Sequence, residues 1–116
     1  MTPSPLNESD FIDAQYSIYT SKRRFISATV QNKQFTLFCE DYGPECEIIN
    51  GKDEYEFYYT LDSNNTAKLF SRLRIEFDVI EDLSELLKIA FGFDGGTVAF
   101  EIFCKKNKIK YMRIAL

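Results

Sequence analysis

The spacing of apolar residues changes at Asp62, and this change constrains the fold more than any other feature of the sequence. From Tyr16 to Leu61 most stretches alternate apolar and polar residues, as strands with one buried face do. After Asp62 the apolar residues recur three and four positions apart, which is the spacing of an amphipathic helix. The first half therefore predicts a sheet, and the second half predicts helices that cover it.

The sheet-forming half predicts two hairpins. In the first, residues 25–30 and 35–40 alternate on either side of a short turn at Asn32-Lys33. In the second, Asn50-Gly51 joins a short strand, 47–49, to a longer one, 54–61. This second turn is the stronger signal, because Asn and Gly tolerate a positive φ at little cost. In the longer strand the odd-numbered residues 55–61 share one face, and the face that carries the glutamates is expected to be the wet one.

Three helices and a final strand are expected after Asp62. The capping residues offered for the first helix are Asp62, Ser63 and Asn64, and its apolar side holds Leu69, Phe70 and Leu73. The second helix has the apolar stripe Leu83, Leu86, Leu87, Ala90 and Phe91, with Asp82 as its cap and Gly92 at its end. A third helix is expected from about Thr97 to Lys106, closed by Asn107, and a last strand at 109–116.

This order of elements predicts an α+β fold. We expect an antiparallel β-sheet of about four to six strands, an N-terminal meander plus a C-terminal strand, covered by about three helices. Residues 1–10 hold two prolines and small polar residues, and are expected to form a flexible lead-in. Residues 11–116 are expected to form a single α+β domain.

The composition argues against several functional classes. The chain has no histidine and only three cysteines, so a zinc site and other cofactors are not expected. The run CEDYGPEC places Cys39 and Cys46 too far apart for a zinc clip, and whether they face each other is left open. No motif places a nucleophile beside a base, so we expect no enzyme, although 18 carboxylates leave a paired Asp/Glu site formally open.

The net charge of −4 bears on location and partners. An acidic chain is repelled by phosphate, so neither nucleic acid nor a membrane is the expected partner. The sequence shows neither a signal peptide nor an apolar run long enough to span a membrane. We therefore expect a cytoplasmic protein with a basic protein as partner.

The acidic charge gathers between residues 40 and 56. This segment contains seven acidic residues and one basic residue, so it carries a net charge of −6. The candidate partner-binding residues are Glu40, Asp41, Tyr42, Glu45, Glu47, Asp53, Glu54, Glu56 and Tyr58. Acids interspersed with tyrosines are typical of a surface that selects a basic protein. The alternative interpretation is a hairpin whose charges only keep its edges solvated.

The stretch from Tyr59 to Tyr111 resembles part of a known group of proteins. It contains YTLDSNNTAKLFSRLR, an LSELLK helix, FGFDGG and FEIFCKKNKIKY. These segments resemble the C-terminal half of small uncharacterised bacterial proteins, some of which look like immunity proteins of polymorphic toxin systems. The resemblance implies a small non-enzymatic inhibitor that occludes a basic toxin domain, such as a nuclease. It transfers no functional residue to a position of this chain.

Three hypotheses follow from the sequence. The first is an immunity or antitoxin-type protein that blocks a basic toxin domain through the acidic hairpin. The second is a self-associating structural or phage-derived domain, a homodimer through an edge strand, with no toxin partner. The third is an enzyme based on carboxylates.

Overall fold

A computed structural model of the chain describes residues 8–46 and 51–116. A 3₁₀ helix and four strands come first: η1 (Glu8–Phe11), β1 (Ala14–Thr20), β2 (Arg24–Gln31), β3 (Gln34–Tyr42) and β4 (Glu54–Leu61). Three helices and a last strand follow: α2 (Ser63–Glu76), α3 (Leu83–Phe91), α4 (Gly96–Lys106) and β5 (Met112–Ala115). The strands form one five-stranded antiparallel sheet in the order β1-β2-β3-β4-β5. The α+β prediction is confirmed.

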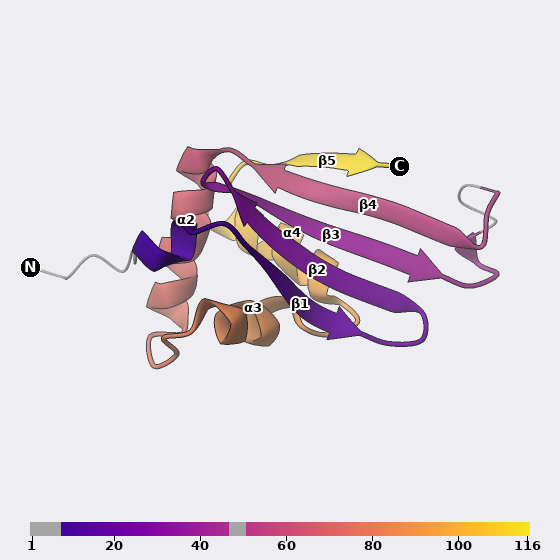
Figure 1. The fold of residues 1–116 in the computed structure, drawn as a ribbon, viewed down its shortest axis with the longest axis horizontal. Helices are drawn as coiled ribbons and strands as arrows, with labels where there is room; N and C mark the ends of the chain where they lie inside the picture. The colour runs from indigo at the N-terminus through magenta and orange to yellow at the C-terminus, as the bar shows by residue number, and fades with distance from the viewer. Residues whose placement is uncertain (1–7, 47–50) are drawn as a thin grey trace, which may run out of the picture.

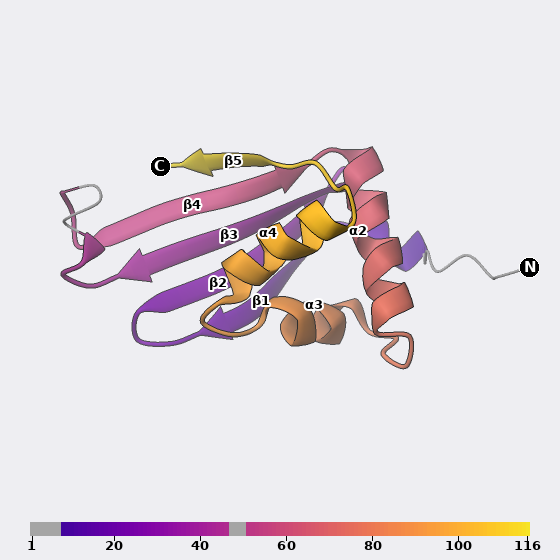
Figure 2. The same cartoon turned by 180° about the vertical axis from the view of Figure 1, so that it is seen from behind.

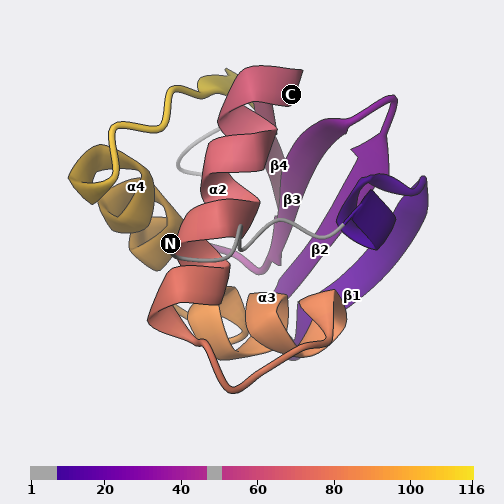
Figure 3. The same ribbon diagram turned by 90° about the vertical axis from the view of Figure 1, so that its left-hand side faces the viewer.

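The helices cover one face of the sheet and leave the other face open (Figures 1, 2 and 3). The core lies between the two layers and contains Ile26, Leu37, Tyr59, Leu69, Leu86 and Phe100 among its buried side chains. Aromatic rings supply much of its contact area; the centroid of Phe100 lies 5.1 Å from that of Tyr59 and 5.4 Å from that of Phe91. A one-sided cover of this kind requires strands that alternate between apolar and polar residues, as the sequence indicated.

The first predicted hairpin is confirmed. β2 and β3 pair from Arg24 opposite Asp41 to Gln31 opposite Gln34, with a two-residue turn between them. The turn residues Asn32 and Lys33 both adopt positive φ values, 52° and 63°. A two-residue hairpin turn of this hand matches the right-handed twist of the strands, so it keeps them paired.

The pairing of β4 differs from the expected second hairpin. The short strand predicted at 47–49 and Asn50 lie outside the described residues, while Gly51 has the positive φ, 75°, that the turn prediction required. β4 pairs along its whole length with β3, from Tyr42 opposite Glu54 to Phe35 opposite Leu61, and on its other side with β5. Alternation in a sequence fixes which face a residue occupies, but it does not fix which strand lies alongside.

α2 begins after Asp62, one of its three candidate caps, and α3 begins after Asp82, its predicted cap. The Asp62 carboxylate accepts a hydrogen bond of 2.8 Å from the Asn65 N–H, and the Asp82 carboxylate accepts one of 3.3 Å from the Glu85 N–H. Gly92 ends α3 as predicted, but its φ of −87° is ordinary. A Cβ there would lie 2.3 Å from the Lys88 carbonyl oxygen, so close packing rather than a left-handed backbone requires glycine.

The last strand is shorter than the predicted 109–116. Lys108 has a φ of 56°, and the Ile109 N–H donates to the Cys104 carbonyl at 2.8 Å, which turns the chain off the end of α4. The Lys110 N–H then donates to the Asn65 side chain on α2 at 2.9 Å. Residues 107–111 therefore donate hydrogen bonds to the last carbonyl groups of α4 and to a side chain of α2. Strand pairing begins only at Met112.

Residues 1–7 of the expected lead-in lie outside the described residues, and its last three belong to η1. Asp10 is buried, with only 2% of its surface exposed. Its carboxylate accepts hydrogen bonds of 2.8 and 2.7 Å from the Arg74 guanidinium on α2. This bidentate ion pair fixes η1 against the helical layer.

Candidate functional site

The open face of the sheet brings together five of the nine predicted partner-binding residues. On β3 the odd-numbered residues 35–39 are buried under the helices, so Glu40 and Tyr42 project to the other side. On β4 Phe57, Tyr59 and Leu61 are buried in the same way, so Glu54, Glu56 and Tyr58 project to the open side. We call this surface the open face; it is the side of the sheet that the helices leave uncovered (Figure 3).

Glu40 and Glu56 lie directly opposite each other on the open face. The Glu56 carbonyl accepts the Leu116 N–H at 2.8 Å on the β5 side. The pair is therefore a non-hydrogen-bonded one between β3 and β4, the kind in which side chains approach most closely. Like charges directly opposite each other repel. Neither carboxylate forms an ion pair with a cation among the described residues.

Tyr42 and Glu54 form the next cross-strand pair on the open face. We call the part of this face that holds Glu40, Glu54 and Glu56 its acidic end. The Tyr42 hydroxyl donates a hydrogen bond to the Glu40 carboxylate. This hydrogen bond, with smaller contributions from burial and neighbouring acids, raises the pKa of Tyr42 to about 12. Because Tyr42 remains a donor at neutral pH, it orients Glu40 without cancelling its charge.

An aromatic band lies beside the acidic end. Phe38 stands opposite Tyr58, with ring centroids 5.5 Å apart, and Tyr58 stands opposite Ile114 on β5. Phe25 lies opposite Glu40 on the other side and is 38% exposed. The strand positions on this face carry three glutamates and no lysine or arginine. The open face thus combines the opposed carboxylates of Glu40 and Glu56 with partly exposed rings, and is suited to a basic protein surface.

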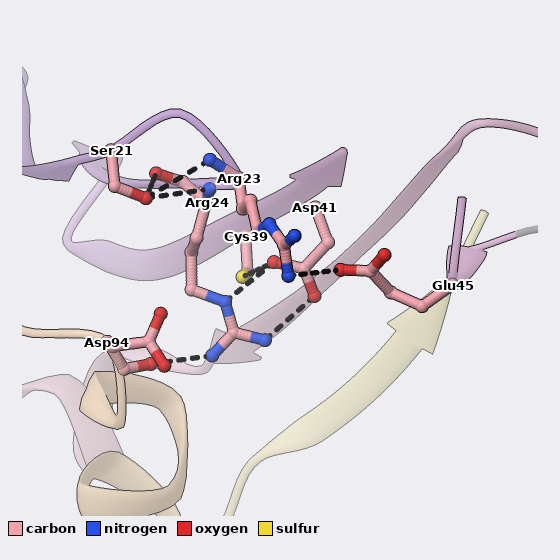
Figure 4. A network of polar contacts seen from close by, with 7 residues as sticks. All are labelled: Ser21, Arg23, Arg24, Cys39, Asp41, Glu45 and Asp94. Carbon is pink, nitrogen blue, oxygen red and sulfur yellow. Dashed lines mark hydrogen bonds and ion pairs between the residues drawn. The ribbon is translucent and has the colours of Figure 1, made fainter. Parts of the chain in front are cut away.

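Asp41 lies on the opposite face from Glu40 and serves the fold. Arg24 donates to its two carboxylate oxygens at 2.6 and 2.7 Å, and also to the Asp94 carbonyl at 2.7 Å (Figure 4). This interaction ties β2 and β3 to the loop between α3 and α4. The hydrogen bonds that Arg24 donates to Asp41 raise the pKa of Arg24 further above its ordinary value. The charge of Asp41 is therefore not part of an open acidic surface.

The remaining predicted partner-binding residues do not share one environment. The Glu45 carboxylate forms an ion pair with the Arg23 guanidinium, with 3.3 Å between Oε1 and Nη1. Both side chains are more than half exposed. Asp53 is exposed, and its backbone carbonyl accepts the Gly43 N–H at 2.8 Å. Glu47 lies outside the described residues. The −6 segment is therefore not one surface: strand alternation and two arginines divide it.

The three cysteines are buried free thiols, so Cys39 and Cys46 do not pair in this structure. The Cys39 thiol donates to Asp41 at 3.6 Å. Burial is the main cause that raises the pKa of Cys39 and of Cys104 to about 12, and burial also raises the pKa of Cys46. These thiols are protonated at neutral pH, which makes them poor nucleophiles.

Sequence reasoning missed the apolar part of the open face: Phe25, Phe38 and Ile114. The available signal was the alternation itself, because Phe38 shares the parity of Glu40 on β3. The contribution of Ile114 could not be found in this way, since it depends on β5 lying beside β4.

In the part of the chain that the structure describes, no group of three or more metal-ligating side chains converges on one point. Within the same residues, no helix has the length and apolar composition needed to cross a bilayer. Comparison of the chain with family models, with curated proteins and with solved structures finds no match.

Proposed function

We propose that the protein is a non-enzymatic binding module of the immunity or antitoxin type, which blocks a basic toxin domain in the cytoplasm. The open face is the docking surface. Its acidic end, Glu40, Glu54 and Glu56, meets the basic surface of the partner, and the rings of Phe38 and Tyr58 supply the apolar contact beside it.

The single observation that carries the proposal is the Glu40–Glu56 pair. Two carboxylates directly opposite each other at a non-hydrogen-bonded site cost the sheet about 0.2 to 1 kcal/mol. The Arg24 guanidinium pairs with Asp41 on the helical side of the sheet, so it does not offset this repulsion. A basic side chain supplied by a partner between the two glutamates would turn this repulsion into attraction.

The mechanism of inhibition is occlusion assisted by electrostatics. A nuclease domain attracts phosphate with clustered lysines and arginines, and an acidic patch is drawn to the same field. Such steering speeds association and selects the partner, while buried rings at the centre of an interface slow dissociation. Catalysis by this chain is not needed at any step.

Affinity capture from the cytoplasm of the native cells tests the proposal. The bait is the wild-type protein, beside the double variant Glu40→Lys/Glu56→Lys. The matched control is Glu76→Lys/Asp78→Lys, which makes the same charge change at two exposed positions at the end of α2. Each bait is washed at about 0.1 M and then about 1 M salt, across which the screening length falls from about 10 Å to about 3 Å.

We expect one basic protein, in near-stoichiometric amount, on the wild type and on the control but not on the open-face variant. It should leave as the salt rises, and its isolated activity should be inhibited by the wild-type protein. The proposal fails if the open-face variant retains the same proteins as the wild type. It also fails if the captured protein is active when bound.

A further inference from the structure

β5 forms one edge of the sheet, and among the described residues it pairs only with β4. The Leu116 N–H donates to Glu56 on β4 at 2.8 Å, so alternate residues of β5 direct their backbone groups to β4. The residues between them, Arg113 and Ala115, direct their N–H and C=O groups to the free edge. Two donors and two acceptors therefore line this edge at a spacing of two residues.

No charged side chain of β5 lies at its free edge to prevent pairing with another strand. Edge strands usually carry charges that prevent pairing with another chain. The only charged residue of β5 is Arg113, and its guanidinium lies 4.4 Å from the centroid of the Phe57 ring on β4, directed away from the edge. Met112 and Leu116 are instead 62% and 67% exposed.

The other edge of the sheet is protected. β1 contains a bulge between Ser17 and Tyr19, which breaks the regular row of backbone groups. α3 also packs against β1 on the helical side. β5 is therefore the edge available to a further strand.

We propose that β5 pairs in antiparallel fashion with β5 of a second copy of the chain, and that Ile114 stands opposite the partner's Ile114 on the two-fold axis. Arg113 then exchanges hydrogen bonds with the partner's Ala115, and Ala115 with the partner's Arg113, giving four across the interface. Met112 stands opposite the partner's Leu116. The larger apolar side chains, those of Met112, Ile114 and Leu116, meet on the open-face side.

The self-complementary pattern selects this register. Only residues 113 and 115 have free backbone groups within the strand, so shifting by two residues leaves a single hydrogen-bonded pair in place of two. A shift toward the start of β5 would also set Arg113 against the partner's Arg113, and opposed like charges repel. The second copy is the favoured occupant because the backbone donors and acceptors match at residues 113 and 115, and the apolar side chains match at 112, 114 and 116.

The dimer would join two sheets into one continuous surface. The axis is perpendicular to the sheet, so both open faces lie on the same side and their acidic ends are related by the two-fold axis. A strand of this length buries less area than a typical stable interface, so the dimer is weak and concentration-dependent. This inference does not depend on the proposed function.

Disulfide cross-linking of cysteine variants of the full chain tests the register of the proposed β5–β5 pairing. At a non-hydrogen-bonded antiparallel pair the Cα atoms lie about 4.5 Å apart, which a disulfide spans. We expect Ile114→Cys to form a covalent dimer on mild oxidation. Met112→Cys, whose counterpart lies about 14 Å away in this register, should not. Cys39, Cys46 and Cys104 are buried, so they do not compete.

A second variant removes the pairing without a new thiol. Ala115→Pro deletes an N–H that points to the free edge and is not used by β4. Ala115→Ser keeps this N–H and is the matched control. Sedimentation equilibrium should show a monomer–dimer equilibrium for the wild type and for Ala115→Ser. Ala115→Pro should weaken it at least about tenfold, because two hydrogen bonds are lost per dimer.

A wild-type protein that stays monomeric up to about 1 mM overturns the proposal. So does an Ala115→Pro variant, with unchanged thermal unfolding, that dimerises as the wild type does. Cross-linking through Arg113→Cys or Ala115→Cys in preference to Ile114→Cys would refute the register.

Discussion

Glu40 and Asp41 are neighbours in the chain, yet they lie in opposite electrostatic environments. Asp41 is on the helical side of β3 and accepts two hydrogen bonds from Arg24. Glu40 is on the open side and faces Glu56, with no ion pair to a described cation. The contrast shows that Asp41 is compensated where it supports the fold, whereas Glu40 and Glu56 oppose each other where the surface is open.

A buried acid on the helical side is compensated in the same way as Asp41. Asp10, the most deeply buried acid of the described residues, has a bidentate partner in Arg74. Removing one member of a buried pair leaves a charge without water or partner, whereas removing one member of a repelling pair relieves strain. Substitutions on the two sides should therefore change stability with opposite signs.

Arg74→Met should have the largest effect. The Asp10 carboxylate would lose both hydrogen bonds while it stays buried, so the free energy of unfolding should fall by about 3 to 5 kcal/mol. Urea denaturation followed by circular dichroism measures the change. Arg72→Met, at an exposed position of the same helix, is the control and should stay within about 0.5 kcal/mol of the wild type. Equal losses in the two variants would refute the structural role of the pair.

Arg24→Ala comes next, compared with Arg23→Ala. Arg24 makes three hydrogen bonds in a partly buried place, so its loss should cost about 2 kcal/mol. Arg23 makes an exposed ion pair with Glu45, and its loss should cost at most about 1 kcal/mol. Denaturation of both variants side by side tests whether the network in Figure 4 is as unequal as its geometry indicates. A larger loss for Arg23→Ala would contradict it.

Glu56→Gln should move stability in the other direction. Removing one of two opposed charges relieves repulsion, so the free energy of unfolding should rise by about 0.5 kcal/mol at low salt. The gain should shrink as salt screens the charges. Glu76→Gln is the control with the same chemistry at the end of α2 and should show no such gain. A Glu56→Gln variant that is less stable than the wild type would show that this glutamate supports the fold.

The smallest effect concerns Tyr42, whose pKa is raised to about 12 chiefly by its hydrogen bond to Glu40. Glu40→Ala removes the acceptor and the charge, so this pKa should fall toward the ordinary value of about 10. Titration by NMR, with Tyr42→Phe to assign the signal, measures the shift. An unchanged pKa would mean that the Tyr42–Glu40 contact is not maintained in solution.

Local sequence signals predicted most of the fold. The sequence indicates Asp82 as a cap and Asp62 as one of three candidate caps, because a side-chain acceptor just before an apolar helical stripe satisfies free N–H groups. Asn32-Lys33 was identified as a turn because it separates two alternating stretches. The late start of the last strand was not predictable, because it depends on a hydrogen bond from Lys110 to Asn65, far away in the chain.

The candidate site was predicted only in part, because charges were grouped by sequence segment. Alternation already required Glu40 and Asp41 to occupy opposite faces. What the sequence does not contain is the position of Arg24 beside Asp41, which follows from the β2–β3 register. The place of Ile114 next to Tyr58 likewise depends on strand order.

The affinity for the captured basic partner, measured by titration calorimetry, tests the central claim most directly. Glu40→Gln/Glu56→Gln is compared with the control Glu76→Gln/Asp78→Gln at two salt concentrations. The account predicts that the open-face variant binds at least about tenfold more weakly at low salt, with a reduced salt dependence, although it is more stable than the wild type. Equal affinity of the two variants would show that the acids of the open face do not contact the partner.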